Sequence, residues 1–159
     1  MARKKPENLS PRIANRKAFH DYHISEKLEV GIVLMGSEVK SVRNSQVSLA
    51  EGFARVEPQT MELTLYNVNI AHYRQAGINQ HDPIRPRKLL AHKRQIAKLH
   101  DLACSKGVTL VPLAMYFCRG MVKVEIGVGT GKKSHDKRQD LKRRDANKEI
   151  RKGLTRRII

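Results

Sequence analysis

The stretch that decides the fold is VTLVPLAMYFCRGMVKVEIGV, which covers residues 108–128. Apolar and β-branched residues dominate both halves, and the pair Arg119-Gly120 in the middle is typical of a hairpin turn. We therefore predict an antiparallel hairpin with strands over 108–118 and 121–128. Pro112 has no N–H to give to a neighbouring strand, so its strand should lie at a sheet edge or carry a bulge.

The residues before this hairpin also favour strands. Met61, Leu63 and Leu65 alternate with polar residues, which is the period of a strand with one buried face. We expect strands over 18–34, 38–43, 53–56 and 61–70, a helical turn over 46–52, a loop over 74–84 and a helix over 87–105. Six or so strands with one good helix predict a mainly β protein, a small OB-like antiparallel β-barrel, because closure removes exposed sheet edges.

Positive charge is concentrated in three segments of the chain, whose formal net charge is +17. Residues 1–17 carry six basic and one acidic residue, residues 85–106 seven and one, and residues 132–159 twelve and four. Such a pattern indicates a polyanionic partner. No apolar run reaches the roughly 20 residues that a membrane span needs, and the N-terminus does not resemble a signal peptide. Nucleic acid in the cytoplasm is therefore expected rather than a membrane.

The aromatic content narrows the kind of nucleic acid. The chain has no Trp, three Phe and four Tyr, which is few for a protein that stacks successive bases of a single strand. This scarcity favours a folded RNA that is recognised by its shape, its backbone and a few exposed bases.

Enzymatic function is not expected. Residues 127–134 look like a phosphate-binding loop, but Ile126 stands where that motif needs glycine and Lys133 where it needs Ser or Thr. The acids and histidines follow no catalytic spacing. Cys104 and Cys118 lack a CxxC or zinc-ligand pattern and are expected to be buried, reduced thiols. We expect neither cofactor nor metal.

Three segments are expected from charge and hydropathy: a flexible basic arm over 1–16, an OB-like RNA-binding barrel over 17–131 and a basic tail over 132–159. The tail has too few large apolar residues to fold alone. Its few apolar residues recur every four positions, at Ala146, Ile150, Leu154 and Ile158. We predict disorder in the free protein and a helix when the tail docks on a partner; the alternative is a permanently solvated, charged tail.

Four stretches together resemble one family of bacterial proteins. They are Asn15-Arg16-Lys17-Ala18 followed by Tyr22 and Ile24; Gly36-Ser37-Glu38-Val39-Lys40-Ser41-Val42-Arg43; Arg87-Lys88-Leu89-Leu90; and Gly131-Lys132-Lys133 with Asp136-Lys137-Arg138. This set is similar to the small protein B family, which binds transfer-messenger RNA (SsrA). The chain departs from the pattern at Ser45-Gln46, where many relatives carry Gly-Lys, and at Thr130, where a basic residue is common.

The resemblance implies an OB-like barrel with flanking helices that binds the tRNA-like domain of transfer-messenger RNA. The complex then enters stalled ribosomes for trans-translation, in which the barrel stands in for an anticodon arm. The tail is implied to lie in the decoding centre of the 16S rRNA and in the empty mRNA channel. Elongation factor Tu with GTP and alanyl-tRNA synthetase serve the same RNA, so they are indirect partners. We expect a monomer.

The resemblance also implies which residues bind RNA. Asn15, Glu29 and Leu90 match family positions. The Asn15 amide could bind a base edge or a 2′-OH, with a turn residue as the alternative, and the Glu29 carboxylate could accept from a base or hold a cation, with a surface salt bridge as the alternative. The apolar Leu90 could pack on an unstacked base, with packing in a helix core as the alternative. The further RNA-binding candidates are Lys17, Lys40, Arg43, Arg87 and Lys88 for phosphates and Tyr22 for stacking. The implied ribosome-contacting residues of the tail are Gly131, Lys132, Lys133, Asp136, Lys137, Arg138, Lys142, Arg143, Arg144, Lys148, Arg151 and Lys152.

Two other readings of the same composition stay open. A ribosomal or general rRNA-binding protein would carry a similar charge, but would show no preference for a tRNA-like fold. An RNA-processing enzyme would cleave the RNA that it binds.

Overall fold

The computed structural model describes residues 11–78 and 80–156, with backbone alone at 140, 141, 144, 145 and 151–156. Its elements are β1 (Ile13–Ala14), α1 (Arg16–Asp21), β2 (Tyr22–Ile32), α2 (Gly36–Arg43), β3 (Val47–Ser48), β4 (Phe53–Glu57), β5 (Glu62–Tyr66), β6 (Asn69–Ile70), the 3-10 helix η1 (Arg74–Ala76), β7 (Arg87–Leu90), α3 (Lys93–Ala103), β8 (Val108–Cys118), β9 (Met121–Gly131) and α4 (Ser134–Arg156).

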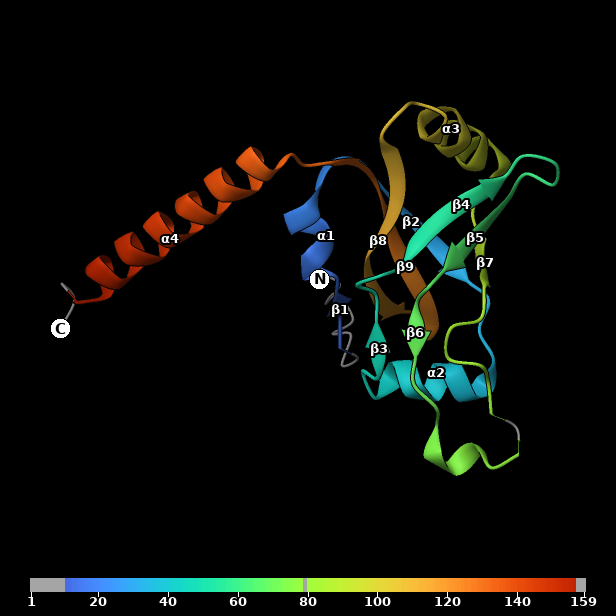
Figure 1. Cartoon of the computed structure of the whole chain (residues 1–159). Coiled ribbons are helices and arrows are strands. Elements are labelled where there is room, and N and C mark those ends of the chain that lie inside the picture. The colour runs from blue at the N-terminus through green and yellow to red at the C-terminus, as the bar shows by residue number, and fades with distance from the viewer. Residues whose placement is uncertain (1–10, 79, 157–159) are drawn as a thin grey trace, which may run out of the picture.

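The main sheet closes on itself. Its strand order is β1-β8-β4-β5-β7-β2-β9, and β9 pairs back with β8, so six strands form a closed antiparallel barrel with β1 added outside β8. Helix α3 lies at one end of the barrel and α2 at the opposite end (Figure 1). The prediction of a mainly β, barrel-forming chain with flanking helices is confirmed.

The hairpin at 108–128 forms as expected. Cys118 pairs with Met121 around a turn in which Arg119 and Gly120 both have positive φ, 51° and 80°, as a hairpin turn with right-handed strand twist requires. The strand register shifts after Pro112, so the proline occupies a bulge. Strand β9 continues to residue 131, beyond the predicted end at 128.

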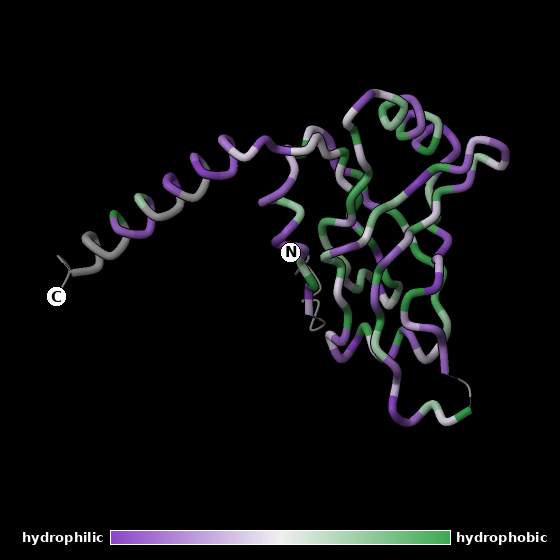
Figure 2. The backbone as a smooth tube through the Cα atoms, viewed as in Figure 1, coloured by the Kyte–Doolittle hydropathy of each residue, from purple (hydrophilic) through white to green (hydrophobic). Residues whose placement is uncertain are grey.

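The barrel interior is filled by alternating apolar side chains. Leu63 and Leu65 of β5 and Val124 and Ile126 of β9 are fully buried, and both end helices add side chains to the same core. Figure 2 shows hydrophobic residues alternating with polar ones along the strands, whereas the described part of α4 is mostly polar with a few hydrophobic positions. Strand alternation therefore decides which side chains face outward and meet a partner.

Two predicted elements were wrong in type. Residues 38–43 form helix α2 rather than a strand, because Val39 and Val42 have the three-residue spacing of a helix face and both pack against the core. The predicted helix over 87–105 begins only at Lys93. Its first four residues form β7, which is held between β5 and β2 in the barrel. Neighbouring strands thus override the local sequence preference.

Four smaller predictions also need correction. Residues 18–21 of the strand predicted over 18–34 belong to helix α1, and β2 begins only at Tyr22. Residues 46–52 form the two-residue strand β3 and a turn instead of a helical turn. The strand over 61–70 is split into β5 and β6. Both cysteines are free, but neither is buried as predicted: Cys104 is exposed and Cys118 is half-buried.

The two ends of the chain differ from their predictions in part. Residues 1–10 of the predicted arm lie outside the described residues, while Ile13 and Ala14 pair with β8 and belong to the sheet. The tail is one helix, α4, that projects from the barrel (Figure 1). Disorder of the tail in the free protein and the predicted segment boundaries stay predictions.

Candidate RNA interface

A cluster of polar side chains covers the outer face of β2, β9 and β8. We call it the outer-face cluster, and its members are Arg12, Lys27, Glu29, Tyr116, Lys123 and Glu125. Strand alternation places the five members on β2, β8 and β9 there, since Val30, Val124 and Met115 point into the core beside outward-facing neighbours. Arg12 comes just before β1, which pairs with β8. The strand register brings Glu29 opposite Glu125 and Tyr116 opposite Lys123.

The cluster members contact one another in a defined pattern. The Tyr116 hydroxyl donates a hydrogen bond to the Glu29 carboxylate, and the Lys123 Nζ lies 3.9 Å from Glu29 Oε1. Arg12 pairs with Glu125 and lies over the Tyr116 ring, 4.9 Å from its centre. Burial, and then the hydrogen bond to Glu29, raises the pKa of Tyr116 to about 12, so this group is a neutral donor at ordinary pH.

Further predicted phosphate contacts are exposed. Lys40 lies 5.0 Å from the centre of the Tyr73 ring, and Arg43 lies 5.4 Å from that of Phe117. Lys17 pairs with Glu51 at 2.5 Å, and Lys88 pairs with Glu62. These surface pairs are weak, so phosphate can displace the carboxylates.

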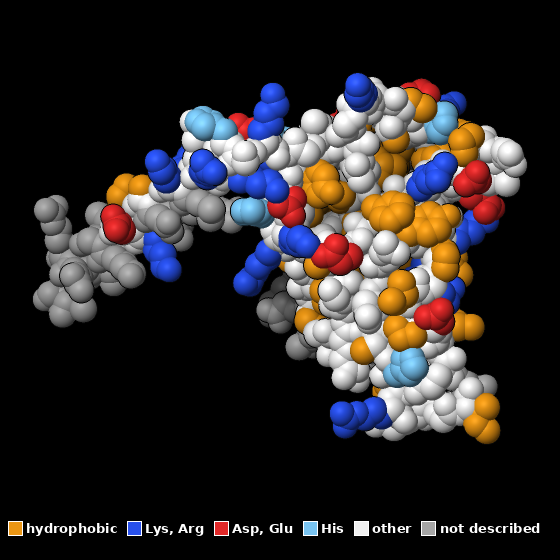
Figure 3. Space-filling model, viewed as in Figure 1, with side chains coloured by type: hydrophobic (Ala, Val, Ile, Leu, Met, Phe, Trp, Pro, Cys, Tyr) orange, Lys and Arg blue, Asp and Glu red, His pale blue; other side chains and the backbone are white. Residues whose placement is uncertain are grey.

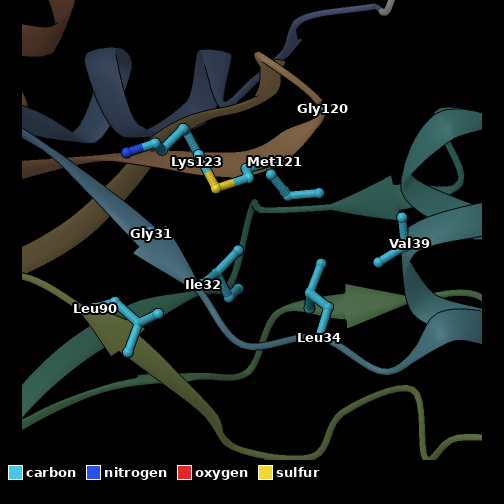
Figure 4. Close-up of a pocket in the computed structure, with 9 residues that line it drawn as sticks. Gly31, Ile32, Leu34, Val39, Leu90, Gly120, Met121 and Lys123 are labelled. Atoms are coloured by element: carbon cyan, nitrogen blue, oxygen red, sulfur yellow. The ribbon is translucent and has the colours of Figure 1, made fainter.

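Leu90 stands at the edge of an apolar hollow of about 350 Å³. Figure 4 shows side chains from β2 and the loop after it, α2, β7 and the β8–β9 hairpin around it, including Ile32, Leu34 and Met121. Leu90 is 52% exposed, so the alternative that it packs in a helix core is wrong. An apolar hollow beside lysines can hold the face of an unstacked base.

Asn15 is mostly buried and is held by the protein's own backbone. It is only 5% exposed, and its amide nitrogen donates to the carbonyls of Leu49 and Pro112, both at 2.9 Å. Its amide oxygen accepts from the Ala18 N–H at 3.1 Å and so caps helix α1. These hydrogen bonds support the turn-residue alternative, while a direct RNA contact of Asn15 stays a prediction. No helix was expected from the sequence after Asn15, so this capping role was not predicted.

Arg87 is likewise a structural residue. It is fully buried, and its guanidinium pairs with Glu38 at 2.8 Å and donates to the carbonyls of Val68, Pro83 and Arg85. The predicted phosphate contact is therefore wrong, because no phosphate reaches a side chain with zero exposure.

Glu38 is the centre of this buried ion network. It also pairs with Arg85 at 2.5 Å and accepts from the Met35 N–H at 2.7 Å. Burial by itself raises the pKa of Glu38, but these hydrogen bonds outweigh burial and hold the pKa below its usual value. The network ties α2 to β7 and to the loop before it. No sequence spacing linked residues 38 and 87.

The root of the tail is attached to helix α1. Lys137 Nζ donates to Asp21 at 2.8 Å, Lys132 Nζ donates to the Phe19 carbonyl at 2.9 Å, and Asp136 accepts from the Lys133 N–H at 3.3 Å. The hydrogen bond from Lys137, followed by that from His20, lowers the pKa of Asp21. Sequence reasoning missed Asp21, because this contact spans 116 residues of chain.

The rest of the tail carries its cations outward. Arg138, Lys142, Arg143 and Lys148 are exposed, and Figure 3 shows Lys and Arg side chains along the helix with few hydrophobic ones. The predictions at Arg144, Arg151 and Lys152 fall on side chains outside the described ones. Gly131 is exposed at the end of β9, and opposite it the half-buried Tyr22 starts β2, its ring against the backbone of Gly129.

None of the helices among the described residues is long and apolar enough to cross a membrane. Across residues 11–78 and 80–156, His, Cys, Asp and Glu form no group of three or more that could hold a metal ion.

Comparisons with known proteins agree with one another. A family model described as SmpB protein matches residues 12–156. SsrA-binding protein of Carboxydothermus hydrogenoformans is 52% identical over 88% of this chain and 93% of its own length. SsrA-binding protein of Latilactobacillus sakei is 49% identical over 99% of this chain and 100% of its own length.

A solved structure described as "tmRNA-SmpB: a journey to the center of the bacterial ribosome" contains a similar chain. That chain is 46% identical with a TM-score of 0.67, and the match covers 79% of this chain and 87% of that one. Sequence and fold therefore agree along most of the molecule, and the chain belongs to the SmpB protein family.

Proposed function

We propose that this protein binds the tRNA-like domain of transfer-messenger RNA and delivers it to stalled ribosomes for trans-translation. Support comes from relatives that are named for binding SsrA and from the similar chain solved with tmRNA and the bacterial ribosome. The observation that carries the proposal is the separation of two basic surfaces: a closed barrel with an ordered outer face and a basic helix that projects from it.

The barrel reads the RNA in this proposal. Lys40, Arg43 and Lys88 are exposed for phosphates, Glu29 faces outward in the outer-face cluster, and Leu90 borders the apolar hollow. A rigid barrel holds these groups at fixed spacing, which suits recognition by shape and a few bases. In the ribosome the barrel takes the place of the anticodon arm that the tRNA-like RNA lacks.

The tail enters the ribosome in this proposal. Helix α4 has 23 residues, so it spans about 35 Å at 1.5 Å per residue. A helix of that length with outward cations fits a channel lined by rRNA phosphate, where mRNA is absent. Asp136, Lys137 and Arg138 lie at its start, nearest the barrel, and act at the decoding centre.

The setting follows from this role. The protein acts where ribosomes are, in the cytoplasm, as a monomer and as a binding protein without catalysis. Elongation factor Tu with GTP and alanyl-tRNA synthetase act on the same RNA and meet the protein through it.

A general rRNA-binding protein is the second candidate, because residues 132–159 hold twelve basic and four acidic residues. The test is to recover the protein from its own cells and to sequence the RNA bound to it. Enrichment of one RNA with a tRNA-like end supports the proposal. Ribosomal RNA in proportion to ribosomes supports the second candidate, and cleavage of the RNA by purified protein indicates a processing enzyme.

A further inference from the structure

The two carboxylates of the outer-face cluster have different partners. Glu125 takes both nearby cations, since Arg12 pairs with it and Lys27 Nζ lies 3.5 Å from its Oε1. Glu29 instead receives its hydrogen bond from the neutral Tyr116 hydroxyl. The ammonium group of Lys123 lies 3.9 Å from Glu29, beyond hydrogen-bond distance.

This arrangement leaves Glu29 able to accept further hydrogen bonds. An ionised carboxylate has about four acceptor positions, and the Tyr116 hydroxyl uses one. The Glu29 side chain is 47% exposed, so its remaining acceptor positions face solvent. A carboxylate repels phosphate, whereas Lys27 and Lys123 beside it attract phosphate. The cluster therefore presents an N–H acceptor between two phosphate-binding groups.

We propose that Glu29 reads the Watson–Crick edge of an unpaired guanine and that Tyr116 is the positioning residue for its carboxylate. Guanine presents N1–H and N2–H₂ side by side, which matches two carboxylate oxygens, whereas adenine, cytosine and uracil each present one donor group on that edge. Lys27 and Lys123 bind the flanking phosphates. This inference rests on the proposed function and names the chemistry of its RNA site.

Tyr116 is suited to positioning because its hydroxyl is separable from the fold. Its chain neighbours Met115 and Phe117 anchor β8 in the core, while the Tyr116 ring lies outside under Arg12. Removing the hydroxyl keeps the ring and the cation–π contact and removes the hydrogen bond to Glu29. The raised pKa keeps this hydroxyl protonated at neutral pH, so it donates throughout the working range.

The first experiment measures the affinity of the full chain for the tRNA-like domain RNA at several salt concentrations. Tyr116→Phe should lower the affinity about tenfold or more, as expected for the loss of a hydrogen bond to a charged group. The loss should be the same at every salt concentration, whereas the loss from Lys123→Ala should shrink as salt rises. Tyr66→Phe, which removes a hydroxyl from β5, is the matched control and should leave affinity unchanged.

Two further measurements separate positioning from a structural role. Tyr116→Phe combined with Glu29→Gln should bind no more weakly than Glu29→Gln alone, because Tyr116 acts through Glu29. Replacing unpaired guanosines of the RNA one at a time by inosine, which lacks the N2 amino group, should weaken binding of the unaltered protein at one position. Glu29→Gln should remove that sensitivity.

Each outcome decides a different point. Equal affinity of Tyr116→Phe and the unaltered protein, or additive losses in the double variant, would refute the positioning role. Absence of any inosine-sensitive position would refute guanine reading. Both results leave the proposed function intact, whereas the unaltered protein failing to prefer the tRNA-like RNA over bulk tRNA would overturn the function and the inference together.

Discussion

The barrel and the tail are both basic, but they hold their charge in different ways. Several barrel cations are paired with carboxylates at set positions, as in Lys17 with Glu51, Lys88 with Glu62 and Lys98 with Glu26. The tail carries twelve basic against four acidic residues over 132–159, and its described cations beyond the root are exposed. A cation held by a carboxylate restricts where a phosphate can lie, while an excess of exposed positive charge accepts any phosphate.

This difference indicates which region of the molecule selects the RNA. A surface on which positive and negative side chains alternate, such as the outer-face cluster, binds an RNA whose charges match that pattern more tightly than other RNAs. A uniformly basic helix supplies affinity for any phosphate-lined channel. In the proposed function, selection of the RNA therefore belongs to the barrel, and entry into the ribosome belongs to the tail.

Removing the tail tests this comparison with the largest expected effect. A chain that ends at Gly131 keeps every strand of the closed barrel. It should melt within a few degrees of the full chain and keep its preference for the tRNA-like RNA over bulk tRNA, while peptide tagging on stalled ribosomes is lost. The measurements are a thermal melt, competition binding and a tagging assay. Loss of the preference in the shortened chain would show that the tail selects the RNA.

Breaking the buried ion network tests the rigidity of the barrel. Arg87→Ala leaves the fully buried Glu38 carboxylate without one of its partners, which costs about 3–5 kcal/mol of unfolding free energy. Urea denaturation measures the change. The neighbouring Lys88→Ala, which removes an exposed pair, should change stability by less than about 0.5 kcal/mol. Similar effects from the two variants would mean that burial at residue 87 is not important.

The sequence predicted the parts of the molecule that local patterns govern. The hairpin over 108–128 has both strand composition and turn residues, so its register, turn and proline bulge followed directly. The tail helix also follows from spacing. The prediction of a closed barrel was correct, because closure pairs the edge strands of a sheet that would otherwise expose unpaired backbone groups.

What the sequence failed to predict depends on contacts between distant residues. Arg87 looks like a surface cation until β7 is placed between β5 and β2, which turns its side chain toward Glu38, 49 residues away. Glu29 was expected to face RNA, but its link to Tyr116 requires β2, β9 and β8 to lie side by side. Asp21 and Lys137 meet only because β9 ends beside the start of β2.

The tail root offers a finer test of how independent the two regions are. Asp21→Asn removes the charge that holds Lys137 on α1. Amide hydrogen exchange in the first turn of α4 should become severalfold faster, while the barrel strands keep their protection. The control Asp101→Asn, on the exposed face of α3, should change neither.

The pH dependence of this contact has a definite sign. The pKa of Asp21 is lowered in the folded protein from the usual 3.8. Its stabilising contribution is therefore fully present at neutral pH and is lost as pH falls below 3.8 through the folded-state pKa. The unaltered protein and Asp21→Asn should show the same exchange rates below that pKa. A difference that persists there would mean that another group holds the tail.

The smallest expected effect lies in the barrel, at the turn after α2. Ser45 has φ of 59°, a left-handed conformation that costs a residue with a Cβ about 1 kcal/mol and glycine almost nothing. Ser45→Gly should therefore raise the unfolding free energy by about 0.5 kcal/mol, after the greater flexibility of glycine in the unfolded chain is counted. Ser48→Gly in β3 is the matched control and should lower stability, because its strand backbone has no such strain. Chemical denaturation measures the unfolding free energy of both variants.

A higher unfolding free energy for Ser45→Gly with unchanged RNA affinity would show that the barrel can be stabilised without altering the outer-face cluster. A lower unfolding free energy for Ser45→Gly would mean that the serine side chain stabilises the turn.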